Sequence, residues 1–180
     1  MEELETPIDK IQETIHETAH HSQDNWVGRI ALFSAVVAVV AAVAALLAGH
    51  HSNEAMISQM KASDSWSYYQ AKGIKSSILQ SKLDLLDQLD KKKDLKDEEK
   101  IADYKKEQSE ISEKAKELEH ESGQHLSVHE ILARSVTLFQ VAIAIAAITM
   151  LTRRKKFIFV SYGFSILALF YFIQALLTKI

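Results

Sequence analysis

The chain has 180 residues, about the length of one domain, with 47% hydrophobic residues, 25% charged residues and a net charge of −3. The charge balance argues against a nucleic-acid partner, and the lack of cysteine excludes disulfides, thiolate catalysis and cysteine-ligated metals. Five glycines and one proline favour long helices over sheets joined by tight turns. Hydrophobic and charged residues occupy separate blocks, which is typical of membrane spans beside extramembrane helices.

Residues 1–25 are predicted to form an acidic amphipathic helix. The segment contains seven acidic residues and one lysine, and Thr6 followed by Pro7 is a typical helix start. Its apolar residues recur at spacings of four, three and four, on one narrow stripe: Leu4, Ile8, Ile11 and Ile15. We expect this stripe to pack on a neighbouring subunit or to lie at the membrane surface, and recruitment of a partner protein is the alternative.

Residues 26–49 are predicted to form the first membrane span. Ile30 to Ala48 is a run of nineteen residues in which Ser34 is the only polar one, long enough to cross a bilayer. The segment before it is acidic, so a cleaved signal peptide is not expected. Small residues recur at helical spacing along the span: Ala31, Ala35, Ala38, Ala42, Ala45 and Gly49. Such a stripe lets helices approach closely, so we expect this face to pack against protein.

Residues 50–134 are predicted to form a long extramembrane helical hairpin. The densest charge lies at 90–97, and a turn there leaves two arms of similar length. The second arm has a heptad seam, namely Ile101, Tyr104, Gln108, Ile111, Ala115, Leu118, Ser122 and His125. The first arm has a matching set, namely Ala71, Ile74, Ile78, Leu85 and Leu89. This periodicity predicts coiled-coil packing, and the polar residues in the seams predict that further copies complete it.

Residues 135–180 are predicted to contain the second and third spans, at about 135–151 and 157–177. A turn of four cations, Arg153 to Lys156, separates them and marks the cytoplasmic side. Six near-membrane lysines and arginines fall on that side and four on the other. The bias predicts a cytoplasmic N-terminus, with the hairpin on the opposite side of the membrane.

An aromatic stretch follows the first span. Trp66 and Tyr69 lie three residues apart on one side of a helix, and Tyr68 points elsewhere. The stretch Ser63-Asp64-Ser65-Trp66-Ser67-Tyr68-Tyr69-Gln70-Ala71-Lys72 resembles that of an uncharacterised bacterial membrane-protein family, domain-of-unknown-function family 4337. The resemblance implies the same order of one span, a charged helical region and two closing spans, and it implies no activity. We interpret Trp66, Tyr68 and Tyr69 as part of a subunit or partner interface, with a ligand pocket as the alternative.

The eight histidines are clustered. His50 and His51 end the first span, and His125 and His129 lie four residues apart before the second. Together with nearby carboxylates they are a candidate zinc site or pH sensor, and solvated histidines are the simpler interpretation. Between Ile30 and Ala48 and within the second and third spans no residue is charged, and the main polar side chains are Gln140 and Gln174. We expect both glutamines to hydrogen-bond between spans or between subunits.

These observations predict an all-α integral membrane protein with three transmembrane helices and an extramembrane coiled-coil-like hairpin. We expect a homo-oligomeric scaffold in the bacterial inner membrane, in contact with lipid, with a periplasmic hairpin that mediates assembly through Ala31, Ala35, Ala38, Ala42, Ala45, Ile74, Ile78 and the aromatic stretch, or that binds a partner protein. The alternatives are an oligomeric channel lined by the first span and a sensor that uses the histidines. No enzyme activity and no cofactor besides the candidate zinc are expected, since phosphate loops and nucleophile motifs are missing.

Overall fold

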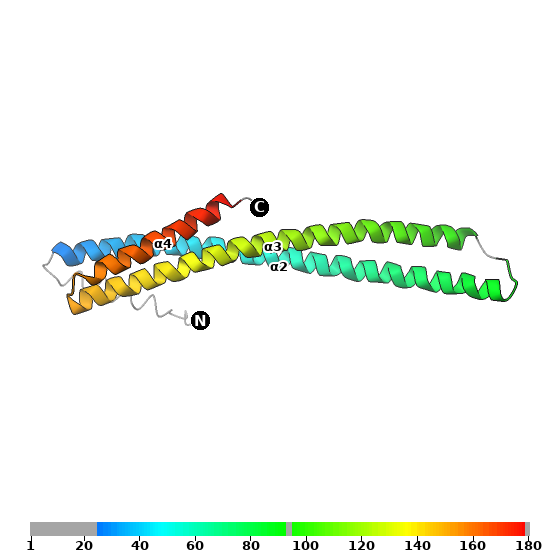
Figure 1. Ribbon diagram of the computed structural model, residues 1–180, viewed down its shortest axis with the longest axis horizontal. Helices are drawn as coiled ribbons and strands as arrows, with labels where there is room; N and C mark the ends of the chain where they lie inside the picture. Colours follow the sequence, from blue (N-terminus) through cyan, green and yellow to red (C-terminus); the bar gives the residue numbers. More distant parts are fainter. Residues whose placement is uncertain (1–24, 93–94, 179–180) are drawn as a thin grey trace, which may run out of the picture. The chain divides into compact units, whose positions relative to one another are not determined.

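The computed structural model describes residues 25–92 and 95–178 and consists of three helices in these ranges. Helix α2 spans Asn25–Gln88, α3 spans Leu95–Thr152 and α4 spans Phe157–Leu177 (Figure 1). No strand occurs in the described ranges, so the predicted all-α class is confirmed. The predicted N-terminal helix lies outside the described residues apart from Asn25.

Each helix contains a segment long and apolar enough to cross a membrane. The mean hydropathy of these segments is 2.9 in α2, 2.0 in α3 and 1.8 in α4. Helix α2 has 64 residues, about three times the ~20 that span a bilayer. Helices α2 and α3 must therefore each combine an apolar segment with a long polar one, as the block composition predicts.

The chain divides into two compact units. The three-helix unit comprises Met1–Ser52 and Leu126–Ile180, of which 25–52 and 126–178 are described, and the hairpin unit comprises Asn53–His125. The three-helix unit contains the apolar ends of α2 and α3 together with α4, and the hairpin unit contains their charged parts. Each unit is built around its own buried face.

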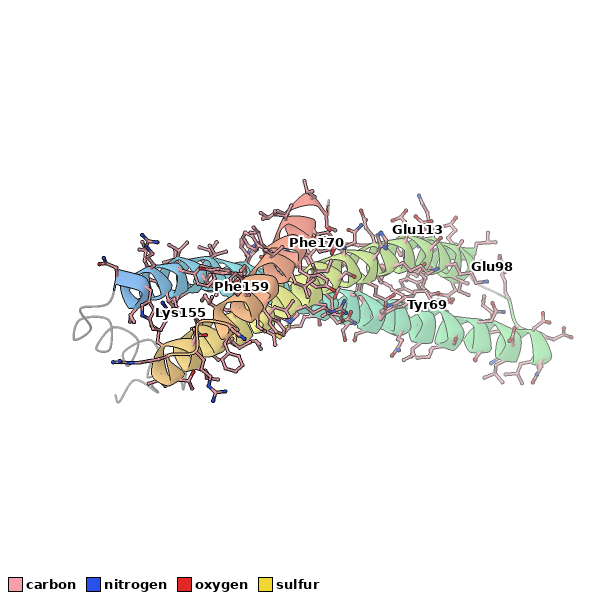
Figure 2. All side chains as sticks on the ribbon, turned by 60° about the vertical axis from the view of Figure 1, so that its left-hand side comes forward. Tyr69, Glu98, Glu113, Lys155, Phe159 and Phe170 are labelled. Atoms are coloured by element: carbon pink, nitrogen blue, oxygen red, sulfur yellow. The ribbon has the colours of Figure 1, made fainter. Side chains whose placement is uncertain are left out.

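Where α3 and α4 pack on each other, the core of the three-helix unit contains small residues and two serine hydrogen bonds. The Ser135 hydroxyl donates to the Ala168 carbonyl oxygen at 2.8 Å, and the Ser161 hydroxyl donates to the Ala142 carbonyl oxygen at 2.7 Å. All four residues are fully buried. Side chains of this size allow α3 and α4 to approach closely, and the hydroxyls find partners without water. Large residues of α4, such as Phe159 and Phe170, project outward instead (Figure 2).

The predicted alanine stripe of α2 is only partly used within the chain. Ala31 is buried, Ala35 and Ala38 are half-buried, and Ala42 and Ala45 are exposed. The buried face of α2 in this unit is the neighbouring one, namely Val27, Ile30, Ala31, Ser34, Val37, Ala41, Ala44 and Ala48. The most exposed part of the alanine stripe therefore lacks a helix partner among the described residues of this chain.

In the hairpin unit, α2 and α3 lie side by side (Figure 1). Helix α2 ends at Gln88 and α3 begins at Leu95, so the connection overlaps the turn predicted at 90–97. Close to the turn, the Lys82 ammonium donates to the Asp97 carboxylate at 2.6 Å, and Asp90 has a positive φ of 54°. The predicted seam of α3 is confirmed, because all its members are buried or half-buried. The seam predicted for α2 is wrong as the face that packs on α3, because Ile74, Ile78 and Leu85 are 55–63% exposed.

The face of α2 that packs on α3 in the hairpin unit is built from small and polar residues. Its buried members are Ala55, Ser58, Ala62, Lys72, Ser76 and Leu83, and Tyr69, Leu79 and Leu86 are half-buried between them. Opposite this face, Ala115 is fully buried and the Ser122 hydroxyl donates to the Ala55 carbonyl oxygen at 2.8 Å. Small residues permit close approach of the two helices at Ala55, Ser58 and Ala62, and leucines fill the contact nearer the turn.

Candidate interaction site on the hairpin

The aromatic stretch Ser63–Lys72 lies on α2 in the hairpin unit, beside the part of α3 that contains Tyr104 and Glu119. On a helix, residues three or four apart share a face, so Trp66, Tyr69 and Lys72 can all reach α3. Tyr68 is 54% exposed, as the predicted split of the aromatic residues requires. Tyr69 is labelled on α2 in Figure 2. The three residues that face α3 each make a different contact.

Trp66 on α2 is hydrogen-bonded to α3 through its indole group. Its Nε1–H donates to a Glu119 carboxylate oxygen at 2.8 Å, and its ring meets the Tyr69 ring edge to face with centroids 5.5 Å apart. A half-buried indole N–H needs such an acceptor, and an edge-to-face aromatic pair adds about 0.5–1.5 kcal/mol beyond burial. The hydrogen bond holds α2 against α3 within one chain, and the ring pair joins neighbouring turns of α2.

Tyr69, Gly73 and Gln108 make a close contact between α2 and α3, which we call the interlock. The Gln108 amide nitrogen donates to the Tyr69 carbonyl oxygen at 3.1 Å. A Cβ atom placed on Gly73 would lie 2.8 Å from that same nitrogen, which is too close. Glycine inside a helix costs about 1 kcal/mol relative to alanine, and here its absent side chain makes room for the amide. A side chain at position 73 would therefore require the Gln108 amide to move.

Lys72 is a charged residue at a buried seam position. Only 9% of its surface is exposed, and its ammonium is paired with the Glu107 carboxylate. The same nitrogen lies 5.2 Å from the centre of the Tyr68 ring and 4.9 Å from that of Tyr104, which gives two cation–π contacts. The hydrogen bond that the Lys72 ammonium donates to the Glu107 carboxylate raises the pKa of Lys72 above its ordinary value of 10.5. The side chain is therefore an ammonium at neutral pH, not the neutral amine that base or Schiff-base chemistry requires.

The opposite side of α2 is open and apolar. We define the outer stripe as Ala71, Ile74, Ile78, Ser81 and Leu85, all of which are exposed. Ile74 is 61% and Ile78 63% exposed. Beside them lies an open hollow of about 620 Å³, lined by Tyr69, Gln70, Gly73, Ile74, Ser77, Ile78, Ser81 and Gln108. Because Gly73, Ser77 and Ser81 in the lining are small, an apolar side chain of another helix can enter this hollow.

The four candidate metal-ligating histidines are divided between the units. The ring centroids of His50 and His51 lie 5.3 Å apart. His129 Nδ1 lies 2.8 Å from the Ala48 carbonyl oxygen, so that nitrogen already has a hydrogen-bond partner. His125 belongs to the hairpin unit, at a half-buried seam position. In the described ranges no group of three or more histidine or carboxylate side chains could hold a metal ion. A zinc site stays a prediction.

Both glutamines of the predicted spans are exposed on the surface of the three-helix unit. Gln140 lies on α3, and Gln174 lies on α4 beside an open hollow of about 410 Å³ that Phe170 and Ile173 also line. Neither side chain hydrogen-bonds to another described residue. An amide inside a bilayer is costly without a partner, so these positions are where a second protein surface would be favourable.

Sequence reasoning missed the inner face of α2 in the hairpin unit, including Lys72. Its signal was a repeat of small and polar residues every seven positions, at Ala55, Ala62, Tyr69 and Ser76. A search for large apolar residues overlooks such a repeat. Gly73 and Gln108 offered no signal of their own, because the contact between them depends on the register of the two helices.

Comparison with known proteins adds a family and no activity. The family model described as Domain of unknown function (DUF4337) matches residues 26–178, a range that contains nearly all of the three helices and the whole aromatic stretch. No curated protein and no solved structure gave a match. The matched range therefore supports the resemblance found in the sequence, and the chain belongs to the family described as Domain of unknown function (DUF4337).

Proposed function

We propose that this protein is a homo-oligomeric membrane scaffold, with the three-helix unit as the anchor and the hairpin unit as the assembly arm. The finer placement that accompanies this proposal is the bacterial inner membrane, with a cytoplasmic N-terminus and a periplasmic hairpin. The observation that carries the proposal is the outer stripe. It is an apolar helix face in the charged part of the chain, where lipid tails are not expected to cover it.

In the hairpin unit, the exposed large hydrophobic side chains belong mainly to α2. Within residues 96–125, all of which are described, α3 exposes no large hydrophobic side chain, and acidic residues such as Glu98 and Glu113 project from it (Figure 2). Within the hairpin unit, the large hydrophobic residues that α2 exposes are Met56, Ile57, Met60, Tyr68, Ile74, Ile78 and Leu85. Of these, Ile74, Ile78 and Leu85 lie along a single face, the outer stripe. A hairpin that only needed to be soluble would not require this asymmetry, since scattered apolar residues are normal and an aligned stripe is typical of a contact surface.

The energy available from the stripe suits chains that a membrane already holds together. Burying one isoleucine or leucine contributes about 1.5–3 kcal/mol, so side chains that are 55–63% exposed have about 1–2 kcal/mol each still to gain. Three such residues on each of two copies give roughly 6–12 kcal/mol, comparable to the ~4–15 kcal/mol that free proteins lose on association. Confinement to one bilayer lowers that loss, because it raises the effective concentration.

The three-helix unit supports assembly independently. Ala42 and Ala45 form an exposed small-residue surface on α2, and Gln140 exposes an amide on α3. In a bilayer, small residues allow close packing and amides hydrogen-bond between helices. A second copy would satisfy both surfaces.

The test is the mass of the complex, measured by native mass spectrometry after extraction into nanodiscs. We expect one defined oligomer for the natural sequence and a smaller species for the double variant Ile74→Asp with Ile78→Asp, which places charge on the outer stripe. The matched control is Ala102→Asp, an exposed alanine on the polar helix α3, and it should leave the mass unchanged. A monomeric natural protein would refute the proposal.

A further inference from the structure

We propose that the outer stripe of α2 packs in parallel against the outer stripe of a second copy of this chain. The inference rests on the proposed function and adds the partner surface and its direction. The four observations that carry it are the position of the stripe around α2, its heptad spacing, its flanking charges and the shared membrane anchor.

The stripe lies on the side of α2 that α3 leaves free. The residues that face α3 in this region are Tyr69, Lys72, Ser76, Leu79 and Leu83, all buried or half-buried. Each outer-stripe residue follows one of these by two positions, and two residues correspond to about 200° around a helix. The inner face and the outer stripe therefore lie on opposite sides of α2. A second helix can pack on the stripe without displacing α3.

The stripe has the spacing of a helix–helix seam. Its members alternate in steps of three and four, with Ala71, Ile78 and Leu85 in one series and Ile74 and Ser81 in the other. This is the heptad pattern that lets two helices stay in contact over several turns. The neighbouring hollow of about 620 Å³ offers space for an isoleucine from the facing helix.

The charges beside the stripe favour a parallel arrangement. One flank carries Lys61, Lys75 and Lys82, while the other carries Gln70, Ser77 and Asp84. In a parallel pair each flank faces the opposite flank of the partner, so Lys75 and Lys82 meet the uncharged Gln70 and Ser77. In an antiparallel pair each flank would face its own kind, and lysines would meet lysines. Like-charge contacts of this kind act against the antiparallel pair.

The membrane imposes the same direction. Copies inserted with one topology are related by a symmetry axis along the membrane normal. That axis makes identical helices parallel and makes a residue near the axis face its own counterpart. Within residues 96–125, α3 exposes no large hydrophobic side chain, so this part of it offers no apolar surface for a different, head-to-tail contact with the stripe. The second copy's own stripe is therefore the occupant that the structure favours.

The natural chain has no cysteine, so single-cysteine variants provide a clean test. In Ala71→Cys and in Ser81→Cys, a parallel contact places each cysteine next to its own counterpart, within the ~4.4–6.8 Å Cα separation that disulfides require. The full-length variants are oxidised in native membranes and separated under non-reducing conditions. Ser109→Cys, an exposed serine on α3, is the matched control. Native mass is measured on the same samples before oxidation.

We expect most of the Ala71→Cys protein and of the Ser81→Cys protein to migrate as a covalent dimer, at least fivefold above the Ser109→Cys control. A dimer that forms only when Ala71→Cys and Ser81→Cys are mixed would indicate an antiparallel contact and overturn the inference. No dimer from either variant in samples whose native mass is oligomeric would also overturn it, and would leave the proposed function standing. A monomeric mass would overturn both.

Discussion

The interlock of Gly73 with Gln108 makes a quantitative prediction about the hairpin unit. Gly73→Ala removes a helix-interior glycine, which by itself stabilises a helix by about 0.8–1 kcal/mol. The new Cβ atom would lie 2.8 Å from the Gln108 amide nitrogen, so the amide must move and lose its 3.1 Å bond to the Tyr69 carbonyl oxygen. That bond is worth about 0.5–1.5 kcal/mol. The two effects oppose each other, and we expect a net change near zero.

The same substitution should behave differently once the glutamine is gone. In a Gln108→Ala background the new Cβ atom has no amide to displace, so Gly73→Ala should stabilise the hairpin unit by about 1 kcal/mol. Hydrogen exchange of amides near residues 69–77, measured by mass spectrometry in nanodiscs, reports this local stability. We expect about fivefold slower exchange in the double variant than in Gln108→Ala alone, and little change between Gly73→Ala and the natural protein. Equal slowing in both backgrounds would refute the interlock.

Three further predictions concern the other contacts described above. Because the Glu107 carboxylate raises the pKa of Lys72 above 10.5, the ion pair stabilises the hairpin unit fully below pH 10.5, and this stabilisation is lost as the pH rises through the raised pKa. The helicity of the natural protein should therefore fall more steeply above that pH than the helicity of Lys72→Met. Parallel curves for the two proteins would contradict this. Ser161→Leu should overfill a fully buried site and cost about 1–3 kcal/mol, whereas Ser161→Ala should cost only about 0.6 kcal/mol, so thermal midpoints that do not separate the two would argue against tight packing. Asp64 lies one heptad before Ala71, so in the parallel contact two carboxylates would face each other; Asp64→Asn should raise the oligomeric fraction at low concentration, and a lowered fraction would count against that contact.

The sequence alone determined the helical architecture, because that information is local. Separate blocks of apolar and charged residues, few glycines and one proline predict long helices with apolar segments, and three such helices are present in the described residues. The charge cluster at 90–97 coincides with the end of α2 and the start of α3. Along α3 only one face of the charged region repeats apolar residues, so its seam from Ile101 to His125 followed from spacing alone.

Only the tertiary structure decided which face of α2 packs on α3. Two faces on opposite sides of that helix carry heptad spacing, one with Ile74 and Ile78 and one with Ala62 and Lys72. Hydrophobicity favours the first, but the second is buried, because alanine and serine allow close approach and because Glu107 on α3 pairs with the lysine. A partner for a buried charge is a property of two helices in register, and no pattern within one helix contains it.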